Sequence, residues 1–124
     1  VHAEDGMDEI SIGAVTHVAE LKEGAISTYS IKPEQFGLKR ADIKTLAVTS
    51  PQESLTMMRA VLDNTPGAAL DIVLLNAAAA IYVAGVAASL DEGMKKARAV
   101  IENGSARARL ASLIAASRRP ASGV

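Results

Sequence analysis

The order of apolar and polar residues divides the chain near residues 32–40. Before this point the pattern is typical of strands, with a short β-rich run at 10–12 and two longer runs at 16–21 and 25–31. The segment Lys22-Glu23-Gly24 separates the two longer runs. A short loop that contains glycine between two β-rich runs predicts a hairpin.

After this point the apolar residues recur every three to four positions, which predicts helices. We expect a single helical turn at 33–37 and four helices, near 51–63, 69–88, 90–103 and 105–118. Ser50, Pro51 and Glu53 form a capping box with proline at the first helical position, and Ser89 with Glu92 forms a second box. The spacing predicts inward positions in the last two helices at Leu90, Met94, Ala97, Val100 and Ile101, and at Leu110, Leu113 and Ile114.

The second helix carries an apolar run at 72–88, interrupted by Asn76, Tyr82 and Gly85. The run approaches the minimum length of a membrane span. It is rich in alanine, and Asp71 precedes it with no basic anchor nearby, so the sequence predicts a buried helix and no membrane partner. A polar group in the middle of such a helix needs a partner, and we expect Asn76 to cap or brace a neighbouring loop and not to take part in catalysis.

One hairpin and about four helices predict an α/β fold, yet an isolated hairpin is marginally stable in water and its edges need further strands. We therefore expect residues 1–119 to form one part of a larger α/β domain, and residues 120–124 to form a flexible tail.

Composition and charge limit the classes of binding partner that we expect. The net charge of −1 provides no field that would attract nucleic acid. The basic residues gather late in the sequence without aromatic side chains among them, so we expect them on the solvent faces of helices. There is no cysteine, which excludes disulfides and thiolate metal sites and fits the reducing cytoplasm.

The chain has its highest local density of ionisable side chains in the acidic run Glu4-Asp5-Gly6-Met7-Asp8-Glu9. Adjacent like charges repel, so such a run is either solvated or neutralised by cations. Carboxylates without cysteine favour a hard ion, Mg²⁺ first. Composition alone favours the solvated loop over the metal site.

The order of motifs changes this balance. Four segments resemble, in sequence order, motifs of the anthranilate phosphoribosyltransferase family: Val1 to Ser11 (V-H, then D-G-[LM]-D-E-[ILV]-S), Thr16 to Leu21 (T-x-V-A-E-L), Tyr29 to Leu38 (Y-x-I-x-P-E-x-F-G-L) and Asn76 to Gly85 (N-A-A-A-x-L-Y-V-A-G). Several linked motifs at consistent spacing are far more specific than any one of them.

The resemblance implies the C-terminal portion of the α/β domain of a phosphoribosyltransferase with a fold like that of nucleoside phosphorylases. Such enzymes transfer phosphoribosyl from phosphoribosyl pyrophosphate to anthranilate in tryptophan biosynthesis, releasing pyrophosphate, and usually form homodimers. By motif match, Asp8 and Glu9 would help to hold Mg²⁺, whereas Glu4 and Asp5 have no such role.

The family's glycine-rich phosphate loop and its anthranilate-binding segments have no match in this chain. We therefore expect the chain alone to be inactive and to need the N-terminal part of the same enzyme. A non-catalytic interaction module and a part of a pyrimidine nucleoside phosphorylase are the alternatives.

Overall fold

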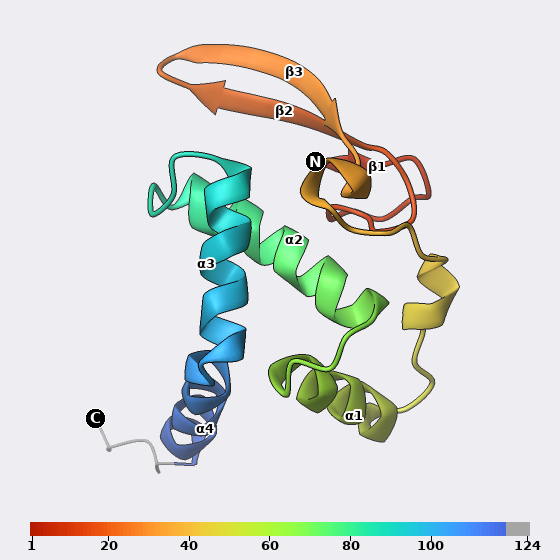
Figure 1. Ribbon diagram of the computed structural model, residues 1–124, viewed down its shortest axis with the longest axis vertical. Helices are drawn as coiled ribbons and strands as arrows, with labels where there is room; N and C mark the ends of the chain where they lie inside the picture. Colours follow the sequence, from red (N-terminus) through yellow and green to blue (C-terminus); the bar gives the residue numbers. More distant parts are fainter. Residues whose placement is uncertain (119–124) are drawn as a thin grey trace, which may run out of the picture.

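The computed structural model describes residues 1–118, so residue 119 and the expected tail at 120–124 lie outside the described part. The strands are β1 (His2–Ala3), β2 (Thr16–Lys22) and β3 (Ala25–Ile31), followed by the short 3₁₀ turns η1 (Pro33–Phe36) and η2 (Ile43–Leu46). The helices are α1 (Pro51–Leu62), α2 (Ala68–Val83), α3 (Leu90–Glu102) and α4 (Ser105–Ser117). In Figure 1 the hairpin lies over the end of α2, and α3 crosses α2 beneath it.

The predicted hairpin is confirmed, and its loop is shorter than expected. Strands β2 and β3 pair antiparallel from Thr16 opposite Ile31 to Lys22 opposite Ala25. The turn is therefore the pair Glu23-Gly24, whose φ angles of 51° and 79° are both positive. Two-residue turns with positive φ match the right-handed twist of the flanking strands.

The β-rich run at 10–12 does not form a strand. The third strand is β1, in which His2 lies opposite His17 and Ala3 opposite Thr16. Ile10 and Ile12 are nevertheless buried, and the backbone groups of this segment are satisfied one by one. Ser11 N donates to Thr16 Oγ1 over 3.1 Å, and Ile12 O accepts from Ala41 N over 3.2 Å. Local partners thus replace a strand ladder.

In both predicted capping boxes, the hydrogen bond to the serine hydroxyl is confirmed. The hydroxyls of Ser50 and Ser89 accept hydrogen bonds from the third residue beyond them, each over 3.2 Å. The glutamate of each box reaches one residue further back than expected, to the N–H of Thr49 in one case and of Ala88 in the other. These bonds are the largest cause lowering the pKa of Glu53 and of Glu92.

Helix α2 ends five residues before the predicted position, at Val83. The chain turns at Gly85, whose φ is 71°. Val86 N donates to Ile81 O and Gly85 N to Tyr82 O, which is the pattern of a Schellman cap. Glycine adopts this left-handed conformation without a Cβ clash. The helix therefore ends at this position although apolar residues follow it.

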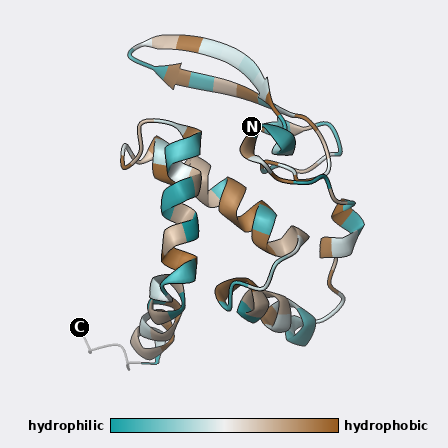
Figure 2. Cartoon of the chain, in the orientation of Figure 1, coloured by the Kyte–Doolittle hydropathy of each residue, from teal (hydrophilic) through white to brown (hydrophobic). Residues whose placement is uncertain are grey.

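The core lies between α2, α3 and the segment at 10–12. Its most buried large side chains include Ile12, Leu74 and Leu75. Hydrophobic and hydrophilic bands alternate along α3 in Figure 2, as expected of a helix with one buried face. Within residues 1–118, none of the helices combines the length and hydrophobicity that a membrane span requires.

The inward positions predicted for the last two helices are partly wrong. Met94, Ala97 and Ile101 are buried and Leu90 is half-buried, but Val100 is 41% exposed. In α4 the expected stripe is open, because Leu113 is 65% exposed and no residue of this helix is buried.

Candidate functional site

The acidic run forms a tight loop between β1 and the buried Ile10. Gly6 N donates to Ala3 O over 3.0 Å and Ala3 N donates to Met7 O over 3.1 Å, so the chain reverses direction directly after the strand. Gly6 has a φ of 89°, a conformation that glycine adopts without strain. Asp8 and Glu9 follow this turn and are exposed.

The first two carboxylates of the run are engaged inside the chain. Asp5 Oδ2 accepts from Ser11 Oγ over 2.5 Å, and Asp5 Oδ1 accepts from Met7 N over 3.4 Å. Glu4 lies 3.3 Å from His17 Nε2, and His17 Nδ1 lies 3.0 Å from Ser30 Oγ. This is a physical reason why Glu4 and Asp5 are poor candidates for metal ligands.

The other two carboxylates of the run, Asp8 and Glu9, have no partner in the part of the chain that the structure describes. Asp8 and Glu9 are exposed, and within residues 1–118 neither side chain takes part in a hydrogen bond or ion pair. No third metal-binding side chain joins them in a cluster within this part of the chain. Mg²⁺ is usually held by one or two carboxylates together with substrate phosphates and water, so two free adjacent carboxylates fit this ion.

Asn76 fastens the loop to α2, as the sequence predicted. Its Oδ1 accepts from Ile10 N over 3.0 Å, and its Nδ2 donates to Ile10 O over 2.8 Å and to Ile72 O over 3.0 Å. Both backbone polar groups of Ile10 are thus paired with one side chain. Ile10 directly follows Glu9, so the anchor lies next to the free carboxylates.

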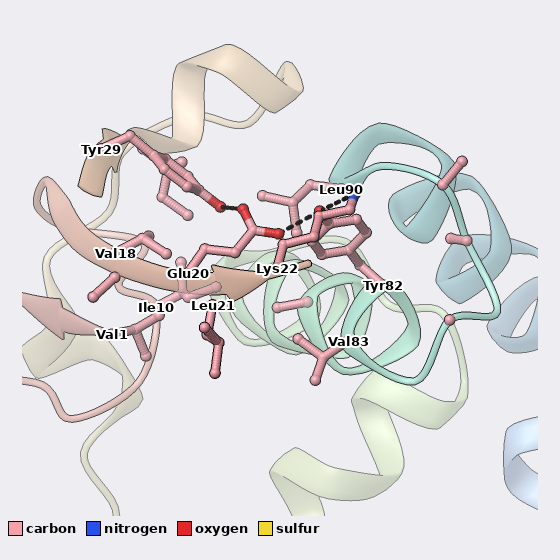
Figure 3. A pocket seen from close by; sticks show the side chains of 16 residues that line it. Val1, Ile10, Val18, Glu20, Leu21, Lys22, Tyr29, Tyr82, Val83 and Leu90 are labelled. Atoms are coloured by element: carbon pink, nitrogen blue, oxygen red, sulfur yellow. Dashed lines mark hydrogen bonds between the residues drawn. The ribbon is translucent and has the colours of Figure 1, made fainter. Parts of the chain in front are cut away.

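A second feature, which sequence reasoning missed, is a hollow of about 540 Å³ between the hairpin and the end of α2. Its lining is mostly apolar, with a polar group at one side (Figure 3). Glu20 accepts from Tyr82 Oη over 2.5 Å and from Tyr29 Oη over 3.1 Å, and Lys22 Nζ donates to Tyr82 Oη over 3.1 Å.

The pKa values of Glu20, Lys22 and Tyr29 are shifted. The hydrogen bond from Tyr82 is the largest cause lowering the pKa of Glu20, and the one from Lys22 to Tyr82 raises the pKa of Lys22. Desolvation is the largest cause raising the pKa of Tyr29. Glu20 and Lys22 share one face of β2, which is visible in the sequence, but no sequence pattern pairs them with Tyr82 some sixty positions away.

Comparison with known proteins gives the family. The pattern of the glycosyl transferase family, a/b domain, matches residues 1–107. The chain belongs to this family. The family assignment confirms the α/β fold class expected from the sequence.

The similar proteins agree with the resemblance seen in the motifs. The chain is 60% identical over 119 residues to the anthranilate phosphoribosyltransferase of Methylococcus capsulatus, a match that covers 96% of this chain and 35% of that protein. It is 56% identical over 110 residues to that of Stenotrophomonas maltophilia, covering 89% of this chain and 32% of that protein.

Among solved structures, the anthranilate phosphoribosyltransferase of Thermus thermophilus superposes with a TM-score of 0.77 at 34% identity, covering 90% of this chain and 33% of that one. A Saccharomyces cerevisiae variant solved with Mg bound superposes with a TM-score of 0.72 at 24% identity, covering 83% of this chain and 30% of that one, a likeness of fold. The chain spans about a third of the length of the relatives it matches.

Proposed function

We propose that the chain is the C-terminal portion of the α/β domain of an anthranilate phosphoribosyltransferase, and that Asp8 and Glu9 are Mg²⁺ ligands of that enzyme. The observation that supports the metal role is the difference between the two pairs of carboxylates in the loop. Asp5 and Glu4 are engaged with Ser11 and His17, while Asp8 and Glu9 are exposed and have no side-chain partner within residues 1–118.

The complete enzyme would take phosphoribosyl pyrophosphate and anthranilate, the substrates implied by the names of its relatives. A diphosphate leaving group carries dense negative charge, which a bound Mg²⁺ offsets as the bond to it breaks. The loop of this chain would present two carboxylates to the ion from a fixed position and leave its other ligand positions to phosphate oxygens and water.

The exposed hairpin supports the proposal that this is one part of a larger enzyme. Leu21 and Ile26 lie opposite each other on the two strands and are 72% and 74% exposed. Such a pair stabilises a sheet when a neighbouring surface covers it. The remaining part of the enzyme would supply that surface, together with the phosphate loop and the anthranilate contacts. We propose a homodimeric, cytoplasmic enzyme.

The test is a pair of substitutions, Asp8→Asn and Glu9→Gln, in the complete enzyme. Each keeps the size of the side chain and removes its charge, so we expect the Mg²⁺ concentration for half-maximal rate to rise about tenfold or more, in line with the effect of disturbing metal sites. The thermal midpoint should change little, because neither side chain has a partner within residues 1–118.

Glu4→Gln is the matched control, since it removes one charge from the same loop at an engaged carboxylate. If all three variants shift the Mg²⁺ dependence equally, the effect is a general one of loop charge and the ligand assignment is wrong. We also expect the purified 124-residue chain to show no transferase activity, and turnover by this chain alone would contradict the proposal that the rest of the enzyme is required.

A further inference from the structure

Asn76 lies in the middle of α2, where an asparagine lowers the stability of the helix. Asparagine is a weak helix former, and its side chain competes with the backbone for hydrogen bonds. Most other residues of α2 are alanine, leucine, isoleucine or valine, and the buried ones among them fill the core. The amide makes one bond within its own helix, to Ile72 O, and the other two bonds leave the helix for Ile10.

The two bonds to Ile10 need a side chain with a donor and an acceptor side by side. A carboxamide offers both groups in the same plane, which matches one N–H and one C=O of a peptide chain. Aspartate at the same place would keep the bond to Ile10 N and lose both donated bonds, and leucine would lose all three. The N–H and C=O of Ile10 therefore explain why a carboxamide side chain is suited to position 76.

The loop is also closed at its base. The bond from Ser11 Oγ to Asp5 Oδ2 joins the two ends of the segment that contains Asp8 and Glu9. Ser11 Oγ in turn accepts from Gly13 N over 2.8 Å, and Ser11 is fully buried. The base of the loop is thus a fixed unit, and Asn76 joins that unit to α2.

We infer that Asn76 is a positioning residue for the Asp8 and Glu9 carboxylates, holding the loop at a set distance from α2 through the backbone of Ile10. The inference rests on the proposed Mg²⁺ role of these carboxylates. Residues that orient metal ligands reduce the rearrangement needed when the ion binds, so their loss lowers metal affinity without removing a ligand.

The experiment uses Asn76→Leu and Asn76→Ala in the complete enzyme, with Mn²⁺ in the presence of inorganic pyrophosphate as the probe. Mn²⁺ affinity, measured by electron paramagnetic resonance, should fall about 10- to 100-fold, which is the usual effect of removing a residue that orients a ligand. The Mg²⁺ concentration for half-maximal rate should rise in parallel, while the rate at saturating Mg²⁺ recovers to near its original value. Amide exchange at residues 8–11 should accelerate more than exchange in α3.

Leu74→Ala is the control for general loosening, because Leu74 is buried on the same helix and makes none of the bonds to Ile10. It should lower stability and leave Mn²⁺ affinity within about twofold, a bound well below the effect expected at the anchor. If it lowers Mn²⁺ affinity as much as the Asn76 variants do, the Asn76 effect is one of helix stability and the inference is wrong.

Asp8→Asn separates this inference from the proposed function. If Asp8→Asn weakens Mn²⁺ binding and the Asn76 variants do not, the carboxylates bind the ion and the positioning role is wrong. If Asp8→Asn leaves Mn²⁺ binding unchanged, the metal role itself is wrong and the inference falls with it.

Discussion

The contact between α2 and α3 depends on the absence of a side chain at Gly93. A Cβ at this position would lie 2.4 Å from Ala78 O and 3.0 Å from Ala78 C and Cα. Ordinary contacts of a Cβ begin at 3.4 Å, so Gly93→Ala requires the two helices to separate locally by about 1 Å. The obstructing atoms belong to the backbone, so no change of rotamer relieves the clash.

The magnitude follows from two opposing effects. Overpacking of a close contact costs about 1–3 kcal/mol, and a rigid backbone obstacle belongs at the upper end of that range. Alanine is favoured over glycine in a helix by about 1 kcal/mol, which offsets part of the cost. We therefore expect Gly93→Ala to lower the free energy of unfolding by about 2 kcal/mol.

The assay is equilibrium unfolding in urea, with the midpoint and the slope compared between variants. Ala99→Gly is the matched control, because Ala99 is exposed on the same helix and reports the intrinsic difference between the two residues. It should destabilise the protein by about 1 kcal/mol. A Gly93→Ala variant as stable as the original, or more stable, would refute the argument from close packing.

Two further predictions concern the cap of α3 and the core. The hydrogen bond from Ala88 N lowers the pKa of Glu92, so this group contributes stability above its ordinary pKa of 4.5, and that contribution is lost as the pH falls through the lowered value. Glu92→Gln should flatten the dependence of the thermal midpoint on pH below about 4.5, and an unchanged profile would contradict this account. Leu75→Ala empties a fully buried position and should cost about 2–5 kcal/mol of unfolding free energy in urea, whereas a loss below about 1 kcal/mol would mean that the site collapses around the smaller side chain.

Local signals predicted most of the elements correctly. The hairpin, both serine caps and all four helices follow from turn residues, capping residues and apolar spacing, each of which acts over a few positions. The errors also have local causes. Gly85 ended α2 within an apolar run, and the apolar residues at 10–12 are buried without forming a strand.

The predicted inward positions were less accurate because burial depends on what packs against a helix. Val100 and Leu113 have the spacing of a buried face, but within residues 1–118 they are 41% and 65% exposed. Periodicity shows that a helix has an apolar face and gives no information about the partner of that face.

The candidate site shows the same division. The sequence by itself determined the acidic run, its resemblance to a metal-binding motif, and the need of Asn76 for a partner. The assignment of Asp8 and Glu9 as ligands stays a prediction. Which carboxylates are engaged and which are free was decided only by the fold, because Asp5 meets Ser11 through the closure of the loop.

Tertiary structure alone also decided the long-range contacts. Asn76 meets Ile10 across 66 positions, and Glu20 meets Tyr82 across 62. Such pairs leave no periodic trace in a single sequence, because each partner obeys the pattern of its own element. The sequence determined which polar groups needed hydrogen-bond partners. The packing of the hairpin and the loop against α2 determined which groups became those partners.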